Sequence, residues 1–209
     1  GQAAAQAAVR PGVGHEGISL ALDIVGVLLA AGRGRRFDPE GVRNKLLQEL
    51  NGAPVVASSA RHMLAALPRV LAVVRDDDDA TAALLAQLGC EVTRCADADT
   101  GMAASLVHAL RQVAQADGWV VALGDMPRVQ PSTIAALCQA VAEGAAIAAP
   151  TYQGRRGNPI AFGRHHLPDL LALAGDRGAR GIVSTNPVND VAVDDAGILL
   201  DVDTPSDLR

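Results

Sequence analysis

Short apolar runs alternate with longer amphipathic stretches from residue 24 onward, and no other feature constrains the fold of this chain as strongly. Strands that alternate with crossover helices form a parallel or mostly parallel sheet covered on both faces. We therefore predict one three-layer α/β domain over residues 24–209. The predicted strands are 24–29, 69–74, 91–95, 119–123, 145–149, 158–162 and 188–193, and the predicted helices are 54–67, 80–88, 102–116 and 131–142.

Length and composition narrow the class of protein. The 209 residues suffice for one α/β domain and fall short of two. A net charge of -5 argues against nucleic acid as a partner, because nucleic-acid-binding domains usually carry a basic excess. No apolar stretch reaches the roughly 18 residues of a membrane span, so no membrane partner is expected.

The three cysteines form no CxxC pair, which suits reduced thiols in the cytoplasm. Residues 1–23 lack the charged-then-apolar layout of a signal peptide, and we interpret them as a disordered leader. We expect a cytoplasmic monomer.

Lys45 is the only lysine in the chain. Coding bias toward arginine would explain its isolation, but a compact ammonium also suits places where a planar guanidinium fits badly. Lys45 follows a glycine-rich basic turn at 30–36, directly after the first apolar run. Phe37 stands where a dinucleotide fingerprint needs glycine, and no Gly-Lys-Ser/Thr of a P-loop follows. Two interpretations remain: backbone N–H groups that bind phosphate, or a plain turn on a basic surface.

Acidic residues follow two further segments. Asp125 comes directly after the apolar run 119–123, where a carboxylate can hold Mg²⁺ or simply cap a helix. Asp201 and Asp203 lie on one side of an extended segment and repel each other unless a cation lies between them. The alternative is that Thr204 caps a short helix that begins at Pro205.

Glycine-rich segments supply the remaining candidates. Gly101 and Ser105 open a predicted helix with small residues, so that a ligand can approach the backbone, although ordinary helix starts look similar. The loops 154–159 and 175–180 are basic turns, and each alone is compatible with a solvated loop.

Taken in their order along the chain, these motifs resemble those of the MobA-like nucleotidyltransferases of molybdenum-cofactor maturation. The resemblance extends from about Val25 to the C-terminus. The segment 29–36 followed by Lys45 resembles the opening motif of the family, and Gly101-Met102 with Ser105-Leu106 resembles its Gly-Met-x-x-Ser-Leu segment. The segments 124–127 and 201–205 resemble its metal-binding strand end and its closing motif. The resemblance implies a Rossmann-like nucleotidyltransferase fold and Mg²⁺-dependent transfer of a nucleotidyl group.

Within the family, Ala30-Ala31 resembles the cytidylyl-transferring branch, because the guanylyl-transferring branch typically has Ala-Gly there. The implied substrates are CTP and a phosphate of molybdopterin, with pyrophosphate released, and a molybdoenzyme or its chaperone is a candidate partner. The sequence departs from the family's opening motif at two places that affect how the triphosphate would be held. Asp38 replaces a usual glycine, and the spacer 37–44 before Lys45 is longer than usual. The alternatives are guanylyl transfer, another small phosphorylated acceptor, a domain turned oxidoreductase, and a non-catalytic nucleotide-binding module.

The resemblance assigns roles residue by residue. The catalytic set is Arg36, Lys45 and Asp125. The nucleotide-binding set is Leu29, Ala30, Ala31, Gly32, Arg33, Gly34, Lys45, Gly101, Ser105 and Asp125. The acceptor-binding set is Arg155, Arg156, Gly157, Asn158, Asp176 and Arg180, and the Mg²⁺ ligands are Asp125, Asp201 and Asp203.

Overall fold

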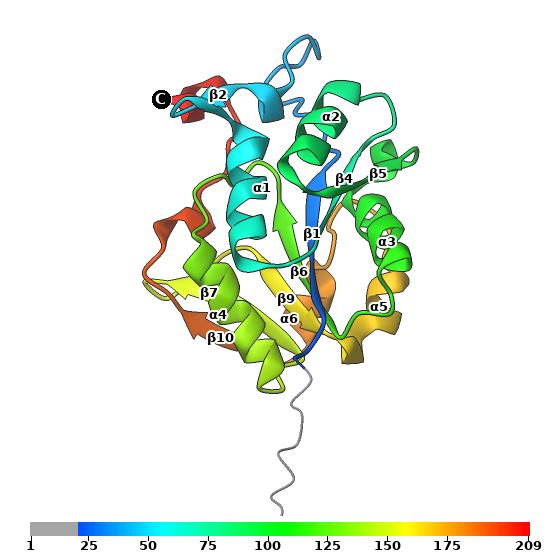
Figure 1. Ribbon diagram of the computed structural model, residues 1–209, viewed down its shortest axis with the longest axis vertical. Helices are drawn as coiled ribbons and strands as arrows, with labels where there is room; N and C mark the ends of the chain where they lie inside the picture. Colours follow the sequence, from blue (N-terminus) through cyan, green and yellow to red (C-terminus); the bar gives the residue numbers. More distant parts are fainter. Residues whose placement is uncertain (1–20) are drawn as a thin grey trace, which may run out of the picture.

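A mixed β-sheet forms the middle layer of the protein (Figure 1). The computed structural model describes residues 21–209, and within them the sheet has eight strands. The strands are β1 (Ile24–Ala30), β4 (Val70–Arg75), β5 (Glu91–Cys95), β6 (Gly118–Leu123), β7 (Ile147–Tyr152), β8 (Arg155–Arg156), β9 (Ile160–Gly163) and β10 (Asn189–Ala192). Their order is β10-β7-β9-β6-β1-β4-β5, and β8 pairs with β7.

Helices cover both faces of the sheet, which confirms the three-layer prediction (Figure 1). The helices α1 (Val55–Ala66), α2 (Asp79–Leu88) and α4 (Pro131–Ala142) cover one face, and α3 (Met102–Gln112), α5 (Leu167–Leu171) and α6 (Arg180–Thr185) cover the other. Side chains of a strand alternate between faces. In β1, Leu28 therefore packs on the α1 side and Val27 on the α3 side, and both are fully buried.

A small subassembly lies beside the C-terminus (Figure 1). The hairpin of β2 (Glu49–Leu50) and β3 (Ala53–Pro54) contributes Leu50 to a third apolar cluster with Phe37, Val55 and Val202. Short 3-10 helices complete the described chain: η1 (Lys45–Leu47), η2 (Ala98–Thr100), η3 (Arg164–His166), η4 (Ala196–Leu199) and η5 (Pro205–Leu208). The cluster ties the loop before Lys45 to the segment after Asp201.

Several boundaries differ from the sequence prediction. Helix α3 ends at Gln112 instead of residue 116, and the Val113 carbonyl accepts a hydrogen bond from the Trp119 indole N–H at 3.0 Å. Strand β9 runs antiparallel to both β6 and β7, whereas every pairing among β1, β4, β5, β6, β7 and β10 is parallel. The short helices α5 and α6 were not predicted.

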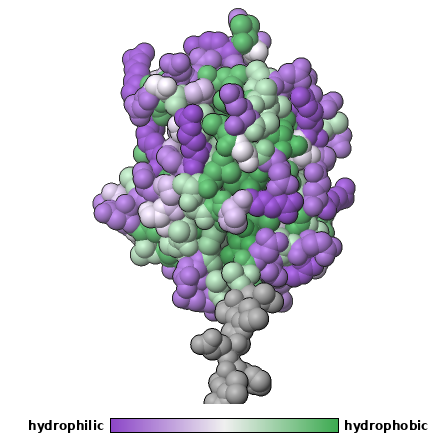
Figure 2. Space-filling view, viewed as in Figure 1, coloured by the Kyte–Doolittle hydropathy of each residue, from purple (hydrophilic) through white to green (hydrophobic). Residues whose placement is uncertain are grey.

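The exterior is mostly polar. Figure 2 shows hydrophilic side chains over most of one face, with hydrophobic surface along its middle. No helix within residues 21–209 combines the length and apolarity needed to cross a bilayer. The predicted leader, up to residue 20, lies outside the described residues.

Candidate functional site

Two adjoining cavities open at the carboxyl edge of the sheet, where ligands bind in open α/β folds. The first has a volume of about 330 Å³. The second has a volume of about 290 Å³. Both cavities are lined by Leu29, Met102 and Leu123, so they are two compartments of one cleft.

Hydrogen bonds between neighbouring segments fix the edge at Asp125. The Gly124 N–H donates to the Leu29 carbonyl at 2.9 Å, and the buried Ser59 hydroxyl donates to the Gly124 carbonyl at 2.8 Å. The Val202 N–H donates to the Asp125 carbonyl at 2.8 Å, which brings the closing acidic segment to the end of β6. These hydrogen bonds therefore bring Leu29, Ser59 and Val202, which are far apart in the sequence, to the end of β6.

The Lys45 ammonium lies 2.9 Å from an Asp125 carboxylate oxygen, and both side chains are largely buried. Gly34 has a φ of +62°, and a Cβ there would lie 3.2 Å from the Lys45 stem, so the turn closes over that stem. Asn44 caps η1 through the Leu46 N–H at 3.1 Å and donates to Asp78 at 2.9 Å. The position of the lone lysine is thus fixed from both sides.

Asp201 and Asp203 join Asp125 at this edge. Arg36 lies 3.5 Å from the Asp203 carboxylate, with its own side chain 83% exposed. Burial raises the pKa of Asp201, and the charges of Asp125 and Asp203 raise it further against the opposing effect of Lys45. The three carboxylates are therefore close enough to repel one another.

A divalent cation is chemically compatible with this oxygen-rich edge. Within the described chain, however, no three His, Cys, Asp or Glu side chains converge on one metal position. The two observations are compatible, because repulsion between carboxylates acts over longer distances than metal coordination. A cation held here would take one or two carboxylates and complete its shell with other oxygens, as Mg²⁺ does with phosphates.

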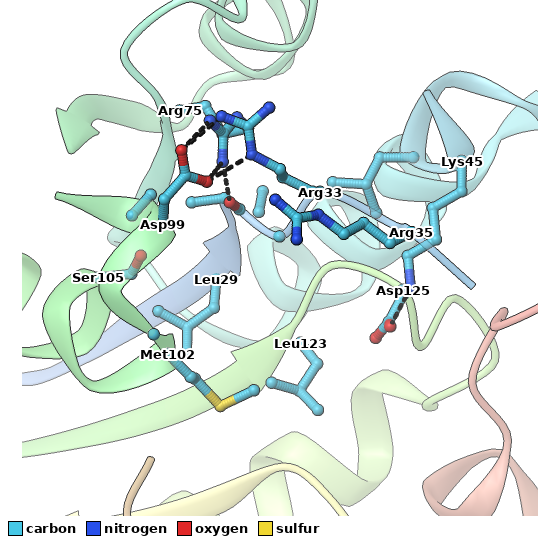
Figure 3. A pocket seen from close by; sticks show the side chains of 16 residues that line it. Leu29, Arg33, Arg35, Lys45, Arg75, Asp99, Met102, Ser105, Leu123 and Asp125 are labelled. Atoms are coloured by element: carbon cyan, nitrogen blue, oxygen red, sulfur yellow. Dashed lines mark hydrogen bonds and ion pairs between the residues drawn. The ribbon is translucent and has the colours of Figure 1, made fainter. Parts of the chain in front are cut away.

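At the opposite end of the first cavity, Asp99 binds two arginines (Figure 3). Arg33 donates from Nε at 2.6 Å, and Arg75 donates from Nη1 at 2.6 Å and from Nη2 at 3.1 Å. The two guanidinium groups hold the pKa of Asp99 far below its ordinary value. Arg75 also donates to the Ala31 carbonyl at 3.4 Å, so this cluster fixes the turn after β1.

Close backbone contacts position the second cavity. A Cβ at Gly157 would lie 2.2 Å from the Ile198 carbonyl oxygen, and one at Gly101 would lie 2.4 Å from the Gly175 carbonyl oxygen. The loops at 154–159 and 175–180 are therefore held against η4 and the start of α3. Arg156, which lines this cavity, also pairs with Asp190 at 2.9 Å.

The structure brings most of the sequence-predicted residues together. Those that line the first cavity are Leu29, Ala30, Ala31, Gly32, Arg33, Lys45, Gly101, Ser105 and Asp125. Those that line the second are Arg156, Gly157, Asn158 and Arg180. Gly34 lies against Lys45. Arg36, Asp201 and Asp203 lie at the acidic edge, outside both linings. Arg155 and Asp176, of the loops 154–159 and 175–180, also lie outside both linings.

Sequence reasoning missed Arg35, Arg75 and Asp99 in the first cavity and Arg177 in the second. Arg75 follows the predicted strand 69–74, so the carboxyl-edge rule would have found it. Asp99 lies in η2, a short 3-10 helix that the sequence pattern did not predict.

The chain is similar to a family model and to a curated protein, each over most of its length. The model of the MobA-like NTP transferase domain matches residues 26–191. The purine catabolism protein PucB of Bacillus subtilis is 30% identical over 197 residues, covering 88% of this chain and 93% of PucB.

Solved structures are similar across nearly the whole chain. Rv0371c of Mycobacterium tuberculosis superposes with a TM-score of 0.79 at 32% identity, covering 90% of this chain and 96% of its own. A manganese complex of Rv0371c superposes with a TM-score of 0.73 at 29% identity, covering 88% and 95%. By the extent of these matches, the chain belongs to the family of proteins with a MobA-like NTP transferase domain.

Proposed function

We propose that this protein transfers the cytidylyl group of CTP to a phosphate of molybdopterin and releases pyrophosphate. Nucleotidyl transfer is the activity of the family to which the chain belongs. The observation that carries the proposal is the two-compartment cleft, in which backbone amides, Lys45 and an acidic edge adjoin a second cavity lined by arginines.

The chemistry requires alignment more than a strong base. A phosphate oxygen of the acceptor attacks the α-phosphorus of CTP, and the bond to the bridging oxygen breaks, so that pyrophosphate leaves with the electron pair. The nucleophile is already anionic, and catalysis then comes from positioning and charge neutralisation. Backbone N–H groups around Ala31 and Gly32 hold the triphosphate, and the Lys45 ammonium neutralises charge that moves onto the leaving group.

A divalent cation, Mg²⁺ in this proposal, would be held by Asp125 and Asp203, with Asp201 close by, and would supply charge neutralisation at the reacting oxygens. The manganese complex of Rv0371c supports a divalent cation of this kind. Loops 154–159 and 175–180 bind the acceptor through Arg156 and Arg180. The proposal also places the protein in the cytoplasm as a monomer that delivers its product to a molybdoenzyme or its chaperone.

Base selection provides the test. Ala30 and Ala31 are both buried and line the first cavity. We expect their methyl groups to narrow the base pocket, so that a pyrimidine fits better than a purine. We expect CTP to bind at least about tenfold more tightly than GTP, roughly 1.4 kcal/mol. The measurement is binding of the four NTPs with Mg²⁺, together with pyrophosphate release in the presence of molybdopterin.

The outcomes separate the alternatives. Equal or reversed affinities for CTP and GTP would remove the cytidylyl assignment while leaving the family unchanged. Nucleotide binding without pyrophosphate release would indicate a binding module, and a yellow purified protein would favour a flavin oxidoreductase.

A further inference from the structure

The arginines of the turn after β1 differ in their partners. Arg33 is held by Asp99, and Arg36 lies beside Asp203. Arg35 lines the first cavity instead, between the Asp99 cluster and the Lys45–Asp125 pair (Figure 3). Within residues 21–209, its guanidinium has neither a hydrogen bond nor an ion pair.

Each of the other cationic side chains of the first cavity has a carboxylate partner. Its cationic side chains are Arg33, Arg35, Lys45 and Arg75. Arg33 and Arg75 share Asp99, and Lys45 pairs with Asp125. In the described part of the protein, Arg35 is thus the one lining cation without a carboxylate partner.

The cationic side chains of the cavity are not equally available to an entering anion, because most of them are already in ion pairs. Contact with Lys45 or Arg75 competes with an existing ion pair, and part of the gain is lost when that pair weakens. Arg35 has no such pair to weaken. Its guanidinium offers five N–H donors and matches the oxygens of a phosphate in bidentate fashion.

We propose that Arg35 is the residue that captures the triphosphate of the nucleotide, and that it does so before any metal is bound. The resemblance assigns the neighbouring Arg36 to catalysis, and in the structure Arg36 lies beside Asp203 at the acidic edge. The inference rests on the proposed function for the identity of the nucleotide and on the charges of the cavity for the contact itself.

The decisive experiment uses inorganic tripolyphosphate as the probe, with EDTA present, and measures binding to the full chain by calorimetry. The variants are Arg35→Gln, Arg36→Gln and the control Arg111→Gln, which removes the same charge from the exposed last turn of α3. We expect Arg35→Gln to weaken binding at least about tenfold, in line with the loss of a charge-assisted bidentate contact. Arg111→Gln is expected to change it by less than about threefold, as surface substitutions do. Arg36→Gln is expected to lose less affinity than Arg35→Gln, because Arg36 already lies beside Asp203.

Arg35→Lys provides a second readout. Lysine keeps the positive charge but lacks the planar guanidinium that binds in bidentate fashion. We therefore expect Arg35→Lys to restore part of the binding that Arg35→Gln loses. Unchanged melting temperatures identify the effect as contact loss and not unfolding. In turnover with CTP, Arg35→Gln is expected to raise KM and to leave kcat within about threefold, because capture precedes the chemical step.

The proposal is overturned if wild-type protein does not bind tripolyphosphate without metal, if Arg35→Gln binds it normally, or if Arg36→Gln loses as much affinity as Arg35→Gln. The probe requires no transfer reaction, which separates this inference from the proposed function. A protein that captures tripolyphosphate through Arg35 but releases no pyrophosphate from any NTP would support the inference and refute the transferase assignment.

Discussion

The lone lysine illustrates how a single residue is positioned. Its stem passes beneath Gly34, its backbone follows the Asn44 cap, and its ammonium reaches Asp125 at 2.9 Å. A guanidinium is wider than an ammonium and prefers planar, two-pronged contacts. Its fork would therefore not fit the space that the turn leaves for a single point charge.

Lys45→Arg is expected to lower kcat by more than about tenfold, because small misplacements near the chemistry can cost about a hundredfold. Lys45→Ala should be more severe, since it removes the charge. The melting temperature should change little in both variants, because Lys45 and Asp125 line the open first cavity and do not belong to the apolar core clusters. The measurements are steady-state pyrophosphate release and thermal melts for the three proteins. Wild-type turnover by Lys45→Arg would mean that the isolated lysine reflects only composition.

Asp125 is the second residue whose role can be separated from folding. Asp125→Asn keeps an oxygen near Lys45 and keeps the backbone contact from Val202, so the fold should persist. A neutral amide is a poor Mg²⁺ ligand, and we expect turnover to fall by about two orders of magnitude or more. The measurement is turnover across an Mg²⁺ titration. Normal turnover at limiting Mg²⁺ would show that Asp125 serves only a structural purpose.

At the scale of elements, a buried carboxylate joins α4 to the segment that leads to the acidic edge. Asp195 is 6% exposed and accepts hydrogen bonds from the Gln130 N–H at 2.8 Å, the Thr133 hydroxyl at 2.7 Å and the Gly197 N–H at 3.0 Å. Its oxygens thus satisfy donors at the start of α4 and in η4. Removing it leaves several buried donors without an acceptor.

Asp195→Ala is expected to lower the free energy of unfolding by about 3 kcal/mol, since hydrogen bonds to charged groups contribute about 1.5–3 kcal/mol and unsatisfied donors add a cost. For a chain of this size, that corresponds to a fall in Tm of roughly 6–12 °C. Asp194→Ala is the matched control, because Asp194 is the exposed neighbour. The measurement is the free energy of unfolding by denaturant. Equal losses for Asp195→Ala and Asp194→Ala would show that the hydrogen bonds of Asp195 do not stabilise the fold.

The elements also show how far sequence reasoning extends. Helix α4 has the predicted bounds, because Pro131 marks its first turn and its apolar spacing is regular. The direction of β9 was beyond reach, since four residues carry no signal that distinguishes parallel from antiparallel pairing. The sequence also could not predict that Arg35, and not Arg36, lines the first cavity. Neighbours in an irregular turn follow no period, so only the folded backbone decides which one lines the cavity.

At the scale of the whole molecule, the direction of β9 determines the layout of the cleft. Parallel strands end at the carboxyl edge, whereas an antiparallel strand begins there. Ile160, at the start of β9, therefore pairs with Val121 near the end of β6. The loop 154–159 before β9 consequently lies at the same edge as the turn after β1, with β6 between them.

The wall shared by the two cavities has a consequence for how such a protein diversifies. Leu29 and Leu123, which belong to both linings, are paired in register on the adjacent strands β1 and β6. Neighbouring strands are spaced by about 4.8 Å whatever side chains they carry. The spacing of Leu29 and Leu123 in the shared wall is thus set by the sheet and not by the loops around the two cavities. Substitutions in the loops 154–159 and 175–180 can therefore alter what the second cavity accommodates, while the wall that it shares with the first cavity stays in place.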